Sequence, residues 1–118
     1  MPEAATLPRV LVAYTNADWN EEPFRFFAGG PGQPEDFTGA DARLGLRLAG
    51  QPANATEFTT DNGMLTLTLP NEIAITAPEA VVSALAPGLY DWDLLVAYPG
   101  GDTQTVLYGQ ARIAQGLA

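Results

Sequence analysis

The sequence predicts an all-β fold: an antiparallel β-sandwich of about seven to eight strands with one short connecting helix. Short apolar stretches alternate with polar residues, and turn-forming residues recur roughly every ten positions. The 118 residues include 12 Gly and 10 Pro, which suits many short strands joined by turns. Strands alternating with long helices, typical of a parallel α/β sheet, are missing from the pattern. A closed barrel is the alternative architecture.

The clearest predicted strand spans residues 40–48. Apolar side chains or Gly occupy most positions, while Asp41, Arg43 and Arg47 alternate with the apolar ones. This period of two is typical of a strand with one face buried and one face in water. Further strands are predicted at 9–14, 23–27, 56–59, 64–69, 72–77, 89–97 and 103–113. The alternation in three of them is expected to direct these side chains to one face, towards the core: Leu65, Leu67, Leu69, Ile73, Ile75, Tyr90, Trp92, Leu94 and Val96.

Turn residues predict the connections between these strands. Asp61-Asn62-Gly63 is a strong hairpin signal, because Asn and Gly both accept a positive φ, so 56–59 is expected to pair with 64–69. Gly39 and Gly63 are expected at a positive φ or at a close approach of strands. Residues 28–36 form a loop, since they contain three Gly and two Pro. Pro78, Glu79 and the helix formers after them predict a short helix over 78–85 that connects the sheets.

The length is that of one domain. Residues 1–7 are expected to form a flexible leader, 8–114 the single β-sandwich domain and 115–118 a tail. The chain has no cysteine, so its stability does not depend on a disulfide or a thiolate metal site. Neither a signal peptide nor an apolar run of about 20 residues is visible, so we expect a protein that is soluble as made.

The charge balance is strongly acidic, with 5 Lys plus Arg against 14 Asp plus Glu and a formal net charge of -9. Nucleic acids and anionic membranes both attract basic proteins, because their phosphates are neutralised by Lys and Arg. We therefore expect neither nucleic acid nor membrane as a partner.

Few residues are suited to catalysis. Histidine and cysteine are absent and Ser83 is the only serine, so a Ser-His-Asp mechanism is excluded. Asp91 and Asp93 share one strand face and could form a glycosidase pair or one side of a calcium site, but a solvated outer face is the favoured interpretation. The turn at 61–63 lacks the other positions of a calcium loop, and 29–32 lacks the Lys and Ser/Thr of a phosphate loop. The sequence predicts a non-enzymatic protein with no catalytic residue, cofactor or metal.

Aromatic residues near the N-terminus are the candidates for surface contacts. Phe24 and Phe26 share a strand face and are expected in the core, which directs Phe27 outward, and Trp19 lies in a polar connection. Exposed aromatic rings stack on sugars or anchor protein interfaces, so Trp19 and Phe27 are the predicted interface residues. The simpler alternative is that both side chains cap the end of the core.

Several blocks of the sequence resemble a family of virion proteins from tailed bacteriophages. They are a turn that opens into an alternating strand (32–40, then Arg47), the Asn-Gly turn with its following strand (62–67), the segment LAPGLYDWDL (85–94) and the end of the last hairpin (109–113). Over residues 9–114 these blocks are similar to the N-terminal domain of phage baseplate upper proteins, an immunoglobulin-like β-sandwich. The first two strands match poorly, and Phe37 stands where the family usually has Leu.

The resemblance implies a non-enzymatic structural or adaptor protein of a phage particle, made in the host cytoplasm and located in the virion. Its expected partners are other virion proteins, in a symmetric assembly of multiple copies that the leader 1–7 could help to join. Tail, baseplate, fibre attachment and capsid surface all stay open as its place. The alternative is a small carbohydrate-binding or cell-surface interaction module that uses exposed aromatics, and a glycosidase comes third.

Overall fold

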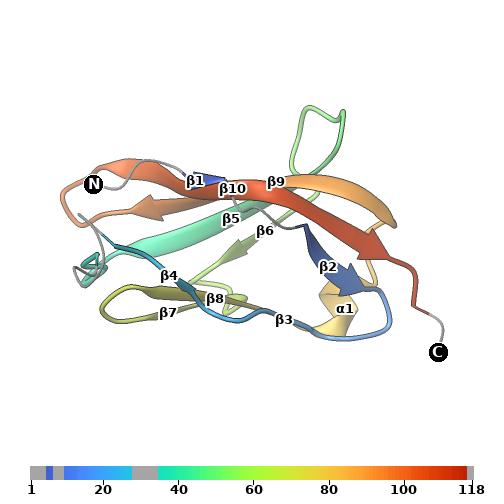
Figure 1. Ribbon diagram of the computed structural model, residues 1–118, viewed down its shortest axis with the longest axis horizontal. Helices are drawn as coiled ribbons and strands as arrows, with labels where there is room; N and C mark the ends of the chain where they lie inside the picture. Colours follow the sequence, from blue (N-terminus) through green and yellow to red (C-terminus); the bar gives the residue numbers. More distant parts are fainter. Residues whose placement is uncertain (1–4, 7–9, 28–34, 117–118) are drawn as a thin grey trace.

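The computed structural model describes residues 5–6, 10–27 and 35–116. In this part of the chain, ten strands form two sheets with one apolar core between them, and there is one short helix. Figure 1 shows how the strands and the helix are arranged. The prediction of an all-β fold is therefore confirmed. No strand pairing joins the two sheets within the described ranges, so these strands do not form a closed barrel.

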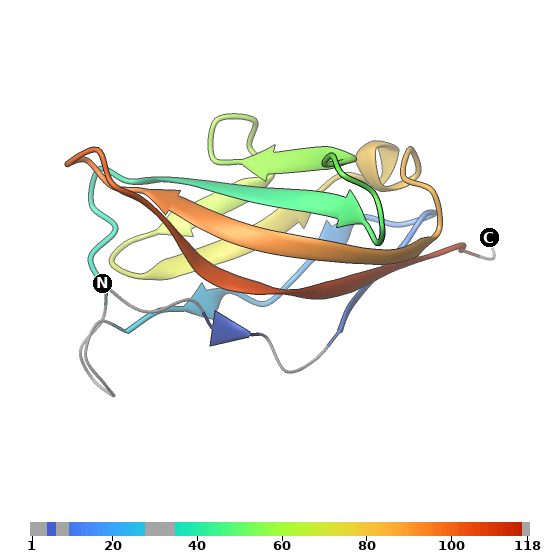
Figure 2. The same ribbon diagram turned by 90° about the horizontal axis from the view of Figure 1, so that it is seen from above.

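The larger sheet has six strands, and its long central strands run along the length of the molecule (Figure 2). Its central pairs are antiparallel, whereas the two short strands on one edge run parallel to their neighbour. In order across the sheet, its strands are β1 (Ala5–Thr6) followed by β2 (Leu11–Tyr14) on one edge, then β10 (Thr103–Ala114), β9 (Gly88–Ala97), β5 (Asp41–Leu48) and β6 (Thr56–Thr59).

The smaller sheet has four strands, all antiparallel to its central strand. That central strand is β8 (Glu72–Ala77), with β7 (Leu65–Thr68) on one side and β3 (Trp19–Asn20) and β4 (Phe24–Arg25) one after the other along the opposite side. The helix α1 (Glu79–Val82) follows β8 and leads the chain towards β9 in the larger sheet.

The predicted count of seven to eight strands is wrong, because one edge of each sheet is formed by two short strands in place of one. β3 and β4 pair with successive parts of β8, and Pro23, which has no N–H to donate, lies between them. In the larger sheet, Ala5 and Thr6 of the predicted leader pair with β10 as the separate strand β1. The rest of that leader, most of the loop at 28–36 and residues 117–118 lie outside the described residues.

The predicted hairpin between 56–59 and 64–69 is also wrong. β6 pairs with β5 in the larger sheet, whereas β7 pairs with β8 in the smaller one, so the Asn62-Gly63 turn carries the chain from one sheet to the other. The Asn62 side chain holds this crossing, since its Oδ1 accepts hydrogen bonds from the N–H groups of Thr59 and Met64, both at 3.0 Å. The turn signal predicts the local reversal correctly, but the partner of each strand depends on distant residues.

The predicted glycine conformations are confirmed, with φ at +77° for Gly39 and +80° for Gly63. Gly39 ends a turn in which Asp36 Oδ1 accepts hydrogen bonds from the N–H and hydroxyl of Thr38, at 3.0 and 2.7 Å. These bonds lower the pKa of Asp36. Phe37 lies fully buried inside the same turn, which anchors the start of β5 to the core.

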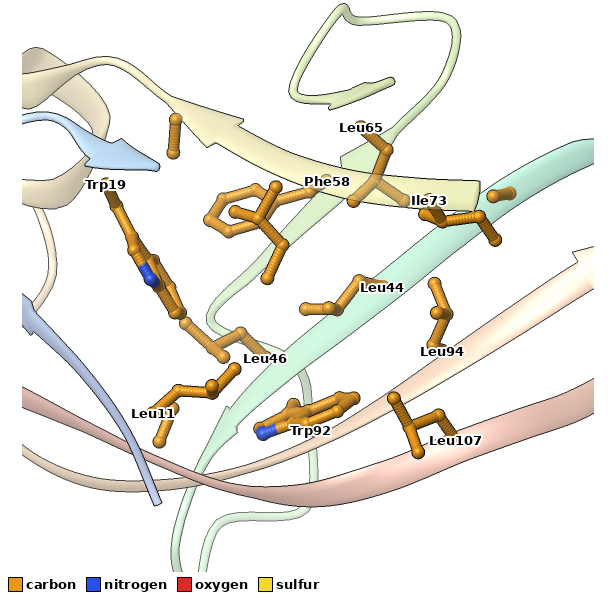
Figure 3. Packing of buried hydrophobic residues seen from close by; sticks show 14 of the residues in the cluster. Leu11, Trp19, Leu44, Leu46, Phe58, Leu65, Ile73, Trp92, Leu94 and Leu107 are labelled. Carbon is orange, nitrogen blue, oxygen red and sulfur yellow. The ribbon is translucent and has the colours of Figure 1, made fainter. Parts of the chain in front are cut away.

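The core lies between the sheets and takes side chains from both (Figure 3). The predicted inward faces of β5, β8 and β9 are confirmed, and Leu65 of β7 is buried as well. Leu69 is 54% exposed, contrary to prediction, because β7 ends at Thr68 and Leu69 already belongs to the turn. The buried side chains include Leu44, Leu46, Phe58, Leu65, Ile73, Ile75, Tyr90, Trp92, Leu94 and Val96.

The predicted short helix is present, although its regular part is a single turn. Pro78 is its extended N-cap residue, and Asp18 Oδ1 accepts the hydrogen bond of the Glu79 N–H at 2.7 Å. Val82 and Leu85 point into the core, so the helix closes one end of it. Among the described residues, no helix is long and apolar enough to span a membrane.

Candidate binding surface

Trp19 is a core residue, and the prediction that it is exposed is wrong. Its side chain is 3% exposed and packs edge-on against Phe58, with ring centroids 5.7 Å apart. Its indole N–H donates to Glu21 Oε1 at 3.2 Å. Trp19 lies in β3 rather than in a loop, and the alternation of Trp19 with the polar residues Asp18 and Asn20 is the signal that could have indicated its burial.

Phe27 points outward as predicted and is 45% exposed, while Phe26 before it is buried. Phe24 is half-buried and stacks on Trp92, with ring centroids 6.1 Å apart and an interplanar angle of 22°. The two predicted interface residues therefore lie in different environments, one in the core and one on the surface. A role of Phe27 in an interface stays a prediction.

A buried carboxylate lies close to Phe26, at a position that the sequence analysis assigned to a loop. Glu35 is 7% exposed, its N–H donates to the Phe26 carbonyl at 3.0 Å, and its Oε1 accepts a hydrogen bond from the Tyr98 hydroxyl at 3.4 Å. Burial, followed by the charge and the hydrogen bond of Glu35, raises the pKa of Tyr98 to about 12. Tyr98 is thus neutral at physiological pH and acts as a structural hydrogen-bond donor.

The outer face of the larger sheet contains a hollow of about 490 Å³ centred on Gly45. The strand register places Glu57 of β6 on one side of Gly45 and Asp93 of β9 on the other, while Arg43 and Arg47 lie two residues away along β5. Gly45 has no side chain to fill the space between these four charged groups. The hollow is lined by Arg43, Gly45, Arg47, Asn54, Glu57, Asp91, Trp92, Asp93, Leu95, Thr105, Tyr108 and Gly109.

Asn54, from the loop between β5 and β6, lies above Gly45. A Cβ on Gly45 would come within 2.7 Å of Asn54 Nδ2, which shows how closely the amide approaches the backbone of β5. The same Nδ2 donates to Glu57 Oε2 at 3.0 Å. Asn54 and Glu57 thus form one wall of the hollow, and the absence of a side chain at position 45 makes room for it.

The other charged groups of the hollow are not paired with one another. Arg47 faces Asp91 across the strands, yet the side chains of Arg43, Arg47, Asp91 and Asp93 form no hydrogen bond or ion pair with any described residue. The ion pair found between described residues joins Arg25 and Glu72 on the smaller sheet, at 3.3 Å. The outward orientation predicted for these four side chains is confirmed, and both aspartates are half-buried rather than fully solvated. The described residues contain no group of three or more Asp and Glu placed to hold a metal ion.

An apolar patch lies on the outer side of β2, at the edge of the same sheet. Val10, Val12 and Tyr14 are 46%, 44% and 53% exposed, and we refer to these three residues as the β2 patch. The alternate residues Leu11 and Ala13 are buried in the core. The sequence predicted a strand here but not its position at the edge of the sheet. Its residues are apolar on both faces, which is typical of a strand whose two faces are both covered.

No protein-family model matches the chain, and a search of curated proteins finds no match to its sequence.

Proposed function

We propose that this chain is a non-enzymatic adaptor domain that acts through contacts with neighbouring protein subunits, as a structural component of a bacteriophage particle. The observation that carries the contact role is the β2 patch. The assignment to a phage particle is supported by the sequence blocks at 32–40, 62–67 and 85–94, which resemble virion proteins.

The β2 patch has the features of a protein–protein contact surface. Its three side chains are apolar and about half exposed, and among the described strands β2 pairs with β10 alone, which leaves its other edge open there. Natural proteins usually protect such an edge with a charge, a proline or a bulge, because its free N–H and C=O groups attract other strands. β2 itself, with the sequence LVAY, has none of these residues. A protein partner would cover both the open edge and the apolar side chains.

An immunoglobulin-like arrangement of the two sheets is part of the same proposal. The order β10-β9-β5-β6 corresponds to strands G, F, C and C′ of a variable-type domain, and the order of the smaller sheet, with β8 between β7 and the β3–β4 edge, corresponds to B, E and D. In addition, the Tyr90 hydroxyl donates to the Ala86 carbonyl at 2.7 Å near the start of β9. A tyrosine at this corner is a hallmark of immunoglobulin-like sandwiches.

The acidic charge fits a component that exists in many copies. A net charge of -9 keeps free copies apart in solution and favours docking on a surface of opposite charge. Location in the virion and assembly in multiple copies are therefore included in the proposal. The alternative, a carbohydrate-binding module based on exposed aromatics, loses one of its two residues because Trp19 is buried.

The proposal is tested by loading variants onto particles. Val12→Glu places a charge in the β2 patch, whereas the matched control Leu69→Glu places the same charge at an exposed Leu beside the smaller sheet. Quantitative mass spectrometry of purified particles should find at least about tenfold fewer copies of Val12→Glu, since burying an unpaired carboxylate in an apolar interface costs more than the roughly 1.4 kcal/mol that corresponds to a tenfold loss. Leu69→Glu should load like the unaltered protein.

Two outcomes would contradict the proposal. Absence of the unaltered protein from purified particles would rule out the virion assignment. Full loading of a Val12→Glu variant whose circular dichroism matches that of the unaltered protein would rule out the β2 patch as the contact surface.

A further inference from the structure

We infer that the hollow around Gly45 is a binding site for a neutral saccharide, whose hydroxyl groups accept hydrogen bonds from the arginines and donate them to the carboxylates. This activity goes beyond the proposed adaptor role and uses a surface separate from the β2 patch. It is also different from the use of Trp19 and Phe27, because neither of these residues lines the hollow.

The size and shape of the hollow suit a small polar ligand. Its volume of about 490 Å³ falls in the range of about 300–1,000 Å³ that small-molecule sites occupy. Arg43 and Arg47 are four residues apart on one strand, which separates their α-carbons by about 13 Å. The backbone at Gly45 forms the floor between them, and Asn54 with Glu57 forms a wall. These elements leave an open space with hydrogen-bonding groups around it.

The hydrogen-bonding capacity of these groups is unused. Each guanidinium offers five N–H donors and each carboxylate about four acceptor sites, yet the side chains of Arg43, Arg47, Asp91 and Asp93 bond to no described residue. Asp91 and Asp93 are half-buried, so part of their contact with water has been lost without replacement. A ligand hydroxyl donates one hydrogen bond and accepts others, so a polyhydroxylated ligand satisfies the arginines and the aspartates together.

The charge balance of the hollow selects a neutral ligand. Its two arginines and three carboxylates sum to one negative charge, although the whole chain carries -9. A phosphate or another anion would meet the carboxylates of Glu57, Asp91 and Asp93, and a metal cation would meet two guanidinium groups. Tyr108, half exposed on β10 at the register position next to Asp93, adds an aromatic ring on which the C–H face of a sugar packs.

A protein surface fits the hollow less well than a saccharide does. The centres of protein–protein interfaces are depleted in charged residues and enriched in aromatic ones. Five of the twelve residues that line the hollow are charged, whereas the β2 patch on the same face is apolar. The two surfaces therefore differ in the chemistry of the partner that each would bind.

The test uses the full chain on an array of neutral gluco-, galacto-, manno- and N-acetylglucosamine oligosaccharides, with sialylated glycans as an anionic arm. Saccharides that bind are then titrated in solution by NMR. We expect binding in the neutral arm, and at least about tenfold weaker binding for Arg47→Ala and for Asp93→Asn, because the first removes a charged donor and the second replaces a charged acceptor with a weaker neutral one. The matched control Arg112→Ala removes an exposed arginine of the same face that does not line the hollow, and it should bind like the unaltered protein.

Gly45→Ala tests the shape of the hollow independently of its charged side chains. The added methyl group displaces the end of the Asn54 side chain, and it fills the floor without altering any charge. Gly45 has no positive φ, so alanine adopts the same backbone conformation without strain and loses less conformational entropy on folding than glycine does. The melting temperature should therefore stay the same or rise, while saccharide binding is lost. Val12→Glu should retain saccharide binding, so failure of this site and failure of the proposed adaptor role are distinguishable.

The inference would be overturned by any of three results: no saccharide bound by the unaltered chain, binding confined to sialylated glycans, or binding that survives both Arg47→Ala and Asp93→Asn.

Discussion

The outer faces of the two sheets differ in how completely their polar and apolar groups are satisfied. The smaller sheet presents small or polar side chains, including Thr66, Thr68 and Thr76, and its Arg25 is paired with Glu72. The larger sheet presents the apolar β2 patch and a hollow in which four of the five charged side chains bond to no described residue. The outer face of the smaller sheet is thus an ordinary solvent-exposed surface. The outer face of the larger sheet has exposed apolar side chains in the β2 patch and, in the hollow, charged side chains without a partner among the described residues. Both proposed binding surfaces therefore lie on the larger sheet.

The largest expected effect is on the free energy of unfolding, when a residue of the core between the two sheets is replaced. Trp19→Ala removes a buried indole that packs on Phe58 of the other sheet, so it should reduce the free energy of unfolding by about 3–5 kcal/mol. Urea denaturation measures this difference. The control Phe27→Ala removes a half-exposed ring and should cost less than about 1 kcal/mol. Equal effects of the two substitutions would mean that Trp19 does not link the sheets.

A smaller effect is expected at the crossing between the sheets. Gly63 has a φ of +80°, which a β-branched residue adopts only with strain, so Gly63→Val should lower the free energy of unfolding by about 1–3 kcal/mol. Gly100→Val is the control, since Gly100 has open space around it and no positive φ. If thermal melting shows the same midpoint for both variants, the crossing does not depend on the conformation of Gly63.

The charged groups of the larger sheet should contribute little to stability. We expect Asp91→Asn combined with Asp93→Asn to change the free energy of unfolding by no more than about 0.5 kcal/mol, because neither carboxylate bonds to a described residue. Thr66→Ala with Thr68→Ala is the matched pair on the smaller sheet. A loss above about 2 kcal/mol for the aspartate pair alone would show that these charges support the fold, and the contrast between the two faces would fail.

A small pH dependence is expected at Tyr98, beside the buried Glu35. The pKa of Tyr98 is raised to about 12 from an ordinary value of 10.0, so its contribution to stability is complete below pH 10 and is lost as the pH rises towards 12. Solvent screening of this partly exposed group keeps the loss below about 1 kcal/mol. Denaturation between pH 8 and 11.5 should therefore give a shallower decline for Tyr98→Phe than for the unaltered protein. Parallel declines would show that Tyr98 ionises equally in the folded and unfolded states.

Strict alternation made part of the fold predictable from the sequence. The inward faces of β5 and β9 follow from period-two patterns of eight and ten residues, and the positive φ of Gly39 and Gly63 follows from local turn chemistry. Both features depend on neighbouring residues only, so no knowledge of distant contacts is needed.

Features that depend on distant contacts could not be predicted in this way. The Asn62-Gly63 signal does not reveal that β6 pairs with β5 and β7 with β8, because strand pairing is decided by the whole core. The burial of Trp19 depends on Phe58, which is 39 residues further along the chain. The hollow around Gly45 requires the register of four strands, so its residues appear in the sequence only as scattered charges.

Hydrogen–deuterium exchange of the protein free in solution and loaded on purified particles tests the central contrast most directly. We expect the amides of β2 (Leu11–Tyr14) to exchange at least about tenfold more slowly on particles, because a partner covers the open edge. Those of β7 (Leu65–Thr68), an edge of the smaller sheet, should keep their rates. Slower exchange at β7 with unchanged exchange at β2 would contradict the assignment of function to the larger sheet.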